Sequence, residues 1–232
     1  MERANSKQGH RWYRSDGGDY WLPSVTSILS VYPKGKQFER WLGESDSYEE
    51  AIGKRDAAGE RGTAVHGAIA DLIGCGEITL PTDTDPKVVK LVQGFVNWWR
   101  EYEPEVIASE FLVAGVGYAG QCDLLCRIGS EEWVIDYKTS SGVYPSYHLQ
   151  TAAYAWAAKD EGLAHTIPRR GTLWLKTSTK KGWQLVESPH VFDDDYTVFQ
   201  ACQTLFHYEY GDQPEFAEEK AAVTSTFRLE EE

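Results

Sequence analysis

An acid and a lysine two residues apart end an apolar stretch of this chain. The segment from Trp133 to Lys138 carries Val and Ile before Asp136, and such β-branched and aromatic residues predict a strand. Alternate residues of a strand share a face, so Asp136 and Lys138 should project together. Burying both charges is costly unless they serve each other or a ligand. A structural ion pair and a reactive site are therefore both open interpretations.

A second acid interrupts the apolar segment that comes before. Asp123 lies within residues 118–128, and Gly129 and Ser130 follow as a short turn. The turn predicts antiparallel neighbouring strands whose acids approach each other. Two close carboxylates repel unless a divalent cation or a shared proton lies between them, and Mg²⁺ or Mn²⁺ suits oxygen ligands. The alternative is that Asp123 satisfies a turn or a backbone amide.

Three polar side chains on predicted helices are further candidates. His66 lies in a long helical pattern, where a lone histidine is more often structural than a ligand. Gln150 and Tyr154 are four residues apart on the helix after Lys138, so they share a helical face. An ordinary amphipathic boundary would give the same pattern.

The elements that must position these residues change character near residue 105. A helix start is predicted at Pro23 with Ser24 as its cap, because serine is a favoured N-cap residue. Helices are predicted over 36–43, 47–73, 86–103 and 145–159, strands over 106–113, 118–128, 132–138, 171–177 and 183–187, and a last helix, capped by Asp193 to Asp195, runs to 210. This order predicts an α/β (α+β) fold with a central sheet flanked by helices.

The chain length fits one domain. We expect a single domain over 1–232, made of a loose or hairpin-like arm (1–22), a mainly helical part carrying His66 (23–104), a sheet core (105–210) and a tail (211–232).

Composition excludes several classes of protein. Hydrophobic residues make up 41% and nine tryptophans are present, which excludes wholesale disorder. No apolar run reaches the ~18 residues of a membrane span, and no apolar leader is visible, so a cytoplasmic location is expected. Lys plus Arg number 23 and Asp plus Glu 36, a net charge of −13 that argues against a general nucleic-acid coat.

Together these motifs resemble the PD-(D/E)XK nuclease superfamily and, within it, the RecB-type branch that includes phage and mitochondrial genome-maintenance exonucleases. The pattern is G-x-x-x-H ending at His66, Glu110 on a strand, G-x-x-D ending at Asp123, I-D-Y-K-T over 135–139 and Q-x-x-x-Y over 150–154, with the phrase from Leu22 to Leu29 also similar. The resemblance implies a restriction-endonuclease-like fold with a mixed sheet.

The resemblance also implies roles for individual residues. The metal ligands would be His66, Asp123, Asp136 and the backbone carbonyl of Tyr137. Lys138 would be the catalytic lysine, Gln150 and Tyr154 would support the site, and Glu110 would bind a second metal or water. Some relatives carry a four-cysteine iron–sulfur cluster, but Cys75, Cys122, Cys126 and Cys202 do not fit that spacing, so no cluster is expected.

The resemblance implies a Mg²⁺- or Mn²⁺-dependent DNA exonuclease that acts at ends or on single strands, in recombination, repair or phage DNA processing. The alternatives are a non-catalytic DNA-binding or recombination-partner protein with this fold, a structure-specific endonuclease, and an ordinary protein with structural acid pairs. Polarity and oligomeric state stay open.

An acidic nuclease must concentrate its few contacts to DNA. Candidates are Lys54, Arg55, Arg61, Tyr147 and Lys176. The alternative for each cation is a solvated surface charge. The net charge of −13 predicts weak, local DNA binding.

Overall fold

The protein is described here by a computed structural model that covers residues 1–14, 18–36, 40, 43 and 47–216. The predicted helix over 36–43 lies mostly outside the described residues, and so does the tail from residue 217.

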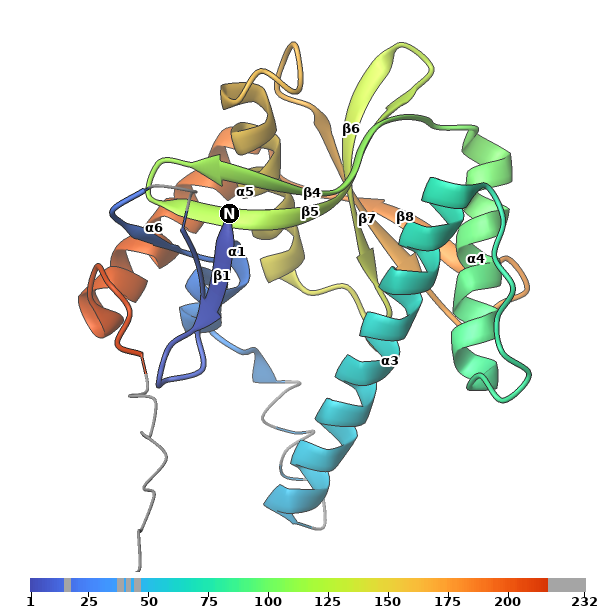
Figure 1. The fold of residues 1–232 in the computed structure, drawn as a ribbon, viewed down its shortest axis with the longest axis horizontal. Helices are drawn as coiled ribbons and strands as arrows, with labels where there is room; N and C mark the ends of the chain where they lie inside the picture. The colour runs from blue at the N-terminus through green and yellow to red at the C-terminus, as the bar shows by residue number, and fades with distance from the viewer. Residues whose placement is uncertain (15–17, 37–39, 41–42, 44–46, 217–232) are drawn as a thin grey trace, which may run out of the picture.

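A five-stranded mixed sheet forms the centre of the molecule (Figure 1). Its strands, in spatial order, are β4 (Glu105–Gly115), β5 (Tyr118–Ile128), β6 (Glu131–Lys138), β7 (Arg169–Leu175) and β8 (Trp183–Glu187). Only β6 and β7 are parallel, and the helix α5 (Pro145–Asp160) connects them. The expected α+β architecture is confirmed, and it is consistent with a restriction-endonuclease-like fold.

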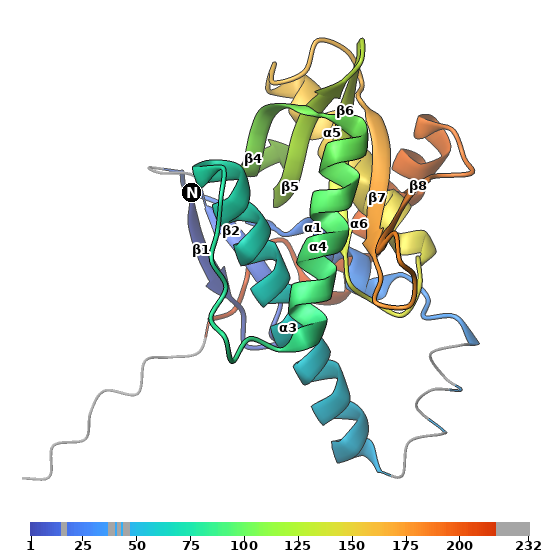
Figure 2. The same cartoon turned by 90° about the vertical axis from the view of Figure 1, so that its right-hand side faces the viewer.

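Helices cover both faces of this sheet (Figures 1 and 2). On β6, Val134 packs with α5 and α6 (Phe192–Tyr210) in one apolar core. Ile135, the next residue, packs with α3 (Tyr48–Cys75) and α4 (Pro86–Tyr102) in a second core. Successive strand residues point to opposite faces. The nearly unbroken apolar run of β6 therefore reflects a strand buried on both sides.

The first residues form a packed sheet rather than a loose arm. Strands β1 (Glu2–Asn5), β2 (Arg11–Arg14) and β3 (Trp21–Pro23) are antiparallel, so the hairpin-like alternative holds. Trp12 and Tyr13 of β2 are buried, which ties this small sheet to the rest of the molecule. A bridge between Ser24 and Ala119 joins the end of this sheet to β5.

Capping residues mark the helix starts. Ser24 caps the short helix α1 (Val25–Ile28) by accepting from the Ser27 amide at 3.0 Å, as predicted, and a 3-10 turn, η1 (Leu29–Val31), follows. Ser47 and Asp85 cap α3 and α4 in the same way. These bonds satisfy amides that the first helical turn leaves without partners.

The start of α6 differs from the prediction. Val191 is the N-cap residue, and Asp193 to Asp195 lie inside the first turn. The carboxylate of Asp195 pairs instead with Arg170 of β7 at 2.7 Å. A buried guanidinium competes for this carboxylate, so the acids stabilise the helix start through its dipole and not as side-chain caps.

Among the described helices, none is long and apolar enough to cross a lipid bilayer.

Candidate functional site

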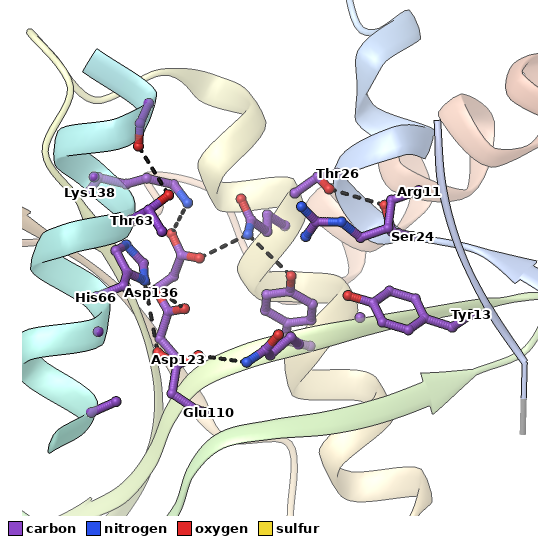
Figure 3. A pocket seen from close by; sticks show the side chains of 18 residues that line it. Arg11, Tyr13, Ser24, Thr26, Thr63, His66, Glu110, Asp123, Asp136 and Lys138 are labelled. Carbon is purple, nitrogen blue, oxygen red and sulfur yellow. Dashed lines mark hydrogen bonds and ion pairs between the residues drawn. The ribbon is translucent and has the colours of Figure 1, made fainter. Parts of the chain in front are cut away.

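A pocket of about 620 Å³ opens between the small N-terminal sheet and the main sheet (Figure 3). One wall carries an acidic cluster with a histidine and a lysine, and the opposite wall comes from β2 and α1. The titratable residues of the first wall are His66, Glu110, Asp123, Asp136 and Lys138. The polar residues of the second wall are Arg11, Tyr13, Ser24 and Thr26.

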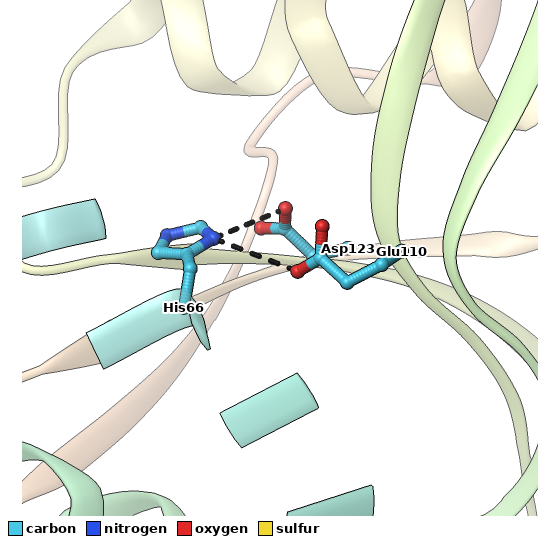
Figure 4. A group of neighbouring side chains, drawn as sticks. All are labelled: His66, Glu110 and Asp123. Carbon is cyan, nitrogen blue, oxygen red and sulfur yellow. Dashed lines mark ion pairs between the residues drawn. The ribbon is translucent and has the colours of Figure 1, made fainter. Parts of the chain in front are cut away.

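A histidine and two acids meet within the pocket (Figure 4). His66 Nδ1 lies 3.3 Å from Asp123 Oδ1 and 3.9 Å from Glu110 Oε1. One potential ligand atom from each residue lies within 4.8 Å of the others. Three elements, α3, β4 and β5, thus bring one nitrogen and two oxygen donors together.

His66 is oriented by its second ring nitrogen. Nε2 lies 3.1 Å from the carbonyl oxygen of Tyr137 and can donate to it, which leaves Nδ1 facing the acids. Burial of the ring opposes protonation, but the charge and hydrogen bond of Asp123 outweigh it and raise the pKa of His66 to about 9. The metal-free imidazole therefore holds a proton that a cation would have to displace.

Asp123 links β5 to β6. The register of the two strands confirms that they are antiparallel neighbours. Asp123 Oδ2 accepts a hydrogen bond from the Tyr137 amide at 2.7 Å, while Oδ1 faces His66. The alternative that Asp123 only satisfies a backbone amide is therefore true of one oxygen, Oδ2. The other oxygen, Oδ1, faces His66 in the pocket.

Asp136 and Lys138 project together, as the spacing predicted. Lys138 Nζ lies 2.6 Å from Asp136 Oδ2. Gln150 Nε2 donates to Asp136 Oδ1 at 2.8 Å and to the Tyr154 hydroxyl at 3.2 Å. Asp136 is 1% exposed, and this burial raises its pKa to about 6 despite the lysine. Gln150 therefore holds one oxygen of the carboxylate, and Tyr154 contacts Gln150 in turn. Lys138 lies at the other carboxylate oxygen.

Glu110 adopts an unusual backbone conformation. Its φ of 48° is left-handed inside strand β4, a geometry that costs roughly 1–3 kcal/mol and is concentrated at functional sites. Gln121 donates to its Oε2 at 2.8 Å, and Oε1 is buried without a hydrogen-bond partner among the described residues. Burial and the nearby charge of Asp123 raise the pKa of Glu110 to about 7.

The donor set fits a divalent cation. Three buried or half-buried carboxylates converge with one imidazole, and their mutual repulsion is relieved by bound protons or by a cation. Carboxylate oxygens with one imidazole nitrogen suit Mg²⁺ or Mn²⁺. The buried Oε1 of Glu110 has no hydrogen-bond donor among the described residues, and a cation would give it a partner.

The four cationic residues predicted to contact nucleic acid do not line the pocket. Helix α3, which carries three of them, contributes other residues to the lining, among them Gly59, Gly62 and Thr63. Each of the four cationic residues has another side chain as a neighbour. Lys54 pairs with Glu50 at 2.6 Å, Arg55 with Asp56 at 2.9 Å, Arg61 with Asp85 at 3.7 Å, and Lys176 bonds Gln184 at 3.0 Å. The fifth candidate, Tyr147, lies beside Lys138, with its ring centre 4.9 Å from Nζ.

Sequence reasoning missed the second wall of the pocket. Ser24 and Thr26 fall in the phrase from Leu22 to Leu29 that carries part of the resemblance, and their hydroxyls lie 3.1 Å apart. Arg11 and Tyr13 gave no signal, because a four-residue strand has no distinctive pattern. Only the packing of the small sheet against β5 brings them to the site.

The chain was compared with models of known protein families. The family model described as the PD-(D/E)XK nuclease superfamily matches residues 87–225, which is more than half of the chain. The matched range contains Asp123, Asp136 and Lys138 and begins after His66. No curated protein matches the chain.

Proposed function

The chain belongs to the PD-(D/E)XK nuclease superfamily, and on that premise we propose that it is a divalent-metal-dependent DNA exonuclease of the RecB-type branch. The observation that carries the proposal is one pocket that gathers Asp123, Asp136 and Lys138 with His66 and Glu110. The motif residues lie far apart in sequence, so a chance match would not place them together.

In this proposal the acidic wall holds the metal. Asp123, Asp136 and His66 would be ligands, and Glu110 would hold a second ion or a water. The Tyr137 carbonyl, which the resemblance names as a further ligand, lies 3.1 Å from His66 Nε2, so it would also orient the imidazole. A bound divalent ion would act as a Lewis acid and lower the pKa of a coordinated water.

Lys138 is the proposed catalytic group. Burial disfavours its charge, but Asp136 and Asp123 outweigh burial and raise the pKa of the lysine. The ammonium can therefore orient a water and stabilise the negative charge that develops on a phosphate. Gln150 would keep Asp136 in position through its hydrogen bond to Oδ1, and Tyr154 would hold Gln150 by accepting from the same amide nitrogen.

DNA binding in this proposal is local. The pocket has a cationic side chain, Arg11, on the wall opposite the acids (Figure 3), which suits an anionic strand between the two walls. Attack at ends or on single strands, and a place in recombination, repair or phage DNA processing, rest on the resemblance to RecB-type exonucleases. A single nuclease domain, a cytoplasmic location and a recombination partner protein belong to the same proposal.

The test is hydrolysis of labelled DNA with Mg²⁺ or Mn²⁺. Linear single and double strands labelled at either end reveal exonuclease polarity, and circular DNA reveals endonuclease activity. We expect Asp136→Asn and Lys138→Ala to lower kcat/KM on linear DNA by about 10²–10⁴-fold, while Lys181→Ala, an exposed control paired with Glu101, keeps it.

Equal activity in wild type and both site variants would overturn the proposal. Cleavage of circular DNA as fast as linear DNA would show that the enzyme is an endonuclease and not an exonuclease. Tight DNA binding without cleavage would favour the non-catalytic alternative.

A further inference from the structure

Lys138 has a second contact that the proposed chemistry does not use. Its Nζ lies 2.6 Å from Asp136 on one side and 4.9 Å from the centre of the Tyr147 ring on another. The first contact is an ion pair, and the second has the geometry of a cation–π interaction. The lysine side chain is 19% exposed, so both contacts act in a partly desolvated place.

The Tyr147 ring is itself held in position. Tyr147 lies in the first turn of α5, and its amide donates to the Tyr144 carbonyl at 3.0 Å. The ring of Tyr144 meets it edge to face, with centroids 5.4 Å apart. The Tyr144 hydroxyl lies in turn 3.1 Å from the Ser141 hydroxyl. The two tyrosines thus form a fixed aromatic surface where the chain leaves β6 and enters α5.

The two partners of Lys138 differ in one decisive property. Asp136 is also a proposed metal ligand, so the ammonium and a cation compete for the same carboxylate. An aromatic face attracts an ammonium through its quadrupole but carries no net charge. The Tyr147 ring can therefore keep Lys138 at the site without competing with a cation, whereas a fourth carboxylate in that place would attract one.

We propose that Tyr147 is a positioning residue that holds the Lys138 ammonium over the reaction centre through its ring face. The inference rests on the proposed function, because it takes Lys138 as the catalytic group. It differs from the direct contact to DNA predicted for Tyr147, since here the ring acts through the lysine.

The kinetic test separates the two roles. Tyr147→Leu removes the ring and should lower kcat by about fivefold to thirtyfold with KM changed less than about twofold. Tyr147→Phe keeps the ring face and should restore most of kcat. Tyr208→Leu, which removes an exposed tyrosine from α6, is the matched control. A rise in KM with kcat unchanged would overturn the inference and favour stacking on DNA.

A second test needs neither DNA nor metal. The urea midpoints of wild type, Tyr147→Leu, Lys138→Met and the double variant form a thermodynamic cycle. If the ring holds the ammonium, Tyr147→Leu lowers the midpoint more when Lys138 is present than when it is Met. Equal shifts in the two backgrounds would overturn the contact.

The two tests also distinguish failure of this inference from failure of the proposed function. An inactive wild type, or equal rates in wild type and Lys138→Ala, counts against the nuclease assignment. A coupled unfolding cycle would then still support the Lys138–Tyr147 contact. Full activity in Tyr147→Leu, beside a Lys138→Ala variant that has lost it, overturns the inference alone.

Discussion

At the scale of single residues, the site is a set of acids whose charges are balanced by neighbours. Asp123 is held by His66 and a backbone amide, and Asp136 by Lys138 and Gln150. Glu110 has only one neutral donor, Gln121, and its second oxygen has no donor among the described residues. Each acid thus has one oxygen bonded to an uncharged donor, while its second oxygen faces His66 in Asp123 and Glu110 and Lys138 in Asp136.

Metal affinity should rise with pH. Burial and neighbouring acids raise the pKa of Glu110 to about 7 and of Asp136 to about 6, and Asp123 raises the pKa of His66 to about 9. All three groups hold protons below these values, and a cation binds only the unprotonated forms. Mn²⁺ affinity should therefore increase by at least about tenfold from pH 6 to pH 8.

Calorimetry in two buffers of different ionisation enthalpy measures both the affinity and the protons released. Affinity that is independent of pH, with no proton release, would contradict this charge arrangement.

Removing the amide of Gln150 should weaken the site without unfolding it. Gln150→Ala deletes the hydrogen bond to Asp136 Oδ1, and loss of such a supporting bond lowers metal affinity or activity by about 10–100-fold. Mn²⁺ titration and kcat/KM measure the effect. The control is Gln93→Ala, which removes an exposed glutamine bonded to Asn97 on α4. Equal metal affinity in both variants would show that Gln150 does not support Asp136.

At the scale of elements, three adjacent strands of the main sheet and two helices assemble the site. Strands β4, β5 and β6 supply the acids and the lysine, α3 supplies His66, and α5 supplies Gln150 and Tyr154. Gly120 of β5 shows how closely α5 packs here, because a Cβ at that position would lie 2.6 Å from the Tyr154 ring. Only glycine allows this approach.

The buried ion pair between β7 and α6 should be important for stability. Arg170 and Asp195 have side chains only 8% and 5% exposed. Asp195→Ala would leave the guanidinium buried without its partner, so we expect a loss of about 3–5 kcal/mol in the free energy of unfolding. Urea unfolding measures this. Asp194→Ala, which changes an exposed acid in the same helical turn, should shift the free energy by less than about 0.5 kcal/mol.

At the scale of the whole molecule, an acidic protein carries an acidic pocket. The net charge of −13 adds to the local repulsion among Glu110, Asp123 and Asp136, and a bound cation relieves part of both. The same net charge repels DNA, so contacts must come from particular cations such as Arg11 on the second wall. Metal binding should therefore affect both folding stability and DNA binding.

Metal should stabilise the folded chain by mass action. The ligand set exists only in the folded state, so Mn²⁺ at a hundred times its Kd should add about 2.7 kcal/mol to the free energy of unfolding. Thermal unfolding with and without EDTA measures the shift. Asp123→Asn should abolish the Mn²⁺-dependent shift in Tm, whereas Asp71→Asn, which changes an acid on α3 outside the pocket lining, should keep it. An equal shift in both variants would place the ion elsewhere.

The sequence by itself determined most of the elements and one face of the site. The limits of β5 and β8 match the predicted ranges, because the glycines of short turns mark strand ends, with Gly117 and Gly129 flanking β5 and Gly182 preceding β8. Strand periodicity placed Asp136 beside Lys138, and the helical repeat placed Gln150 beside Tyr154. These relations are local, so they can be read from spacing alone.

The tertiary structure alone showed the features that are set by packing between segments far apart in the sequence. Three features depend on contacts between distant segments. They are the small sheet that brings Arg11 to the pocket, the left-handed backbone of Glu110, and the ion pair between Arg170 and Asp195. No local pattern encodes them, because each is fixed by how buried charges and apolar faces find partners across the fold. The Tyr147 ring beside Lys138 belongs to the same class, since it depends on where α5 begins relative to the end of β6.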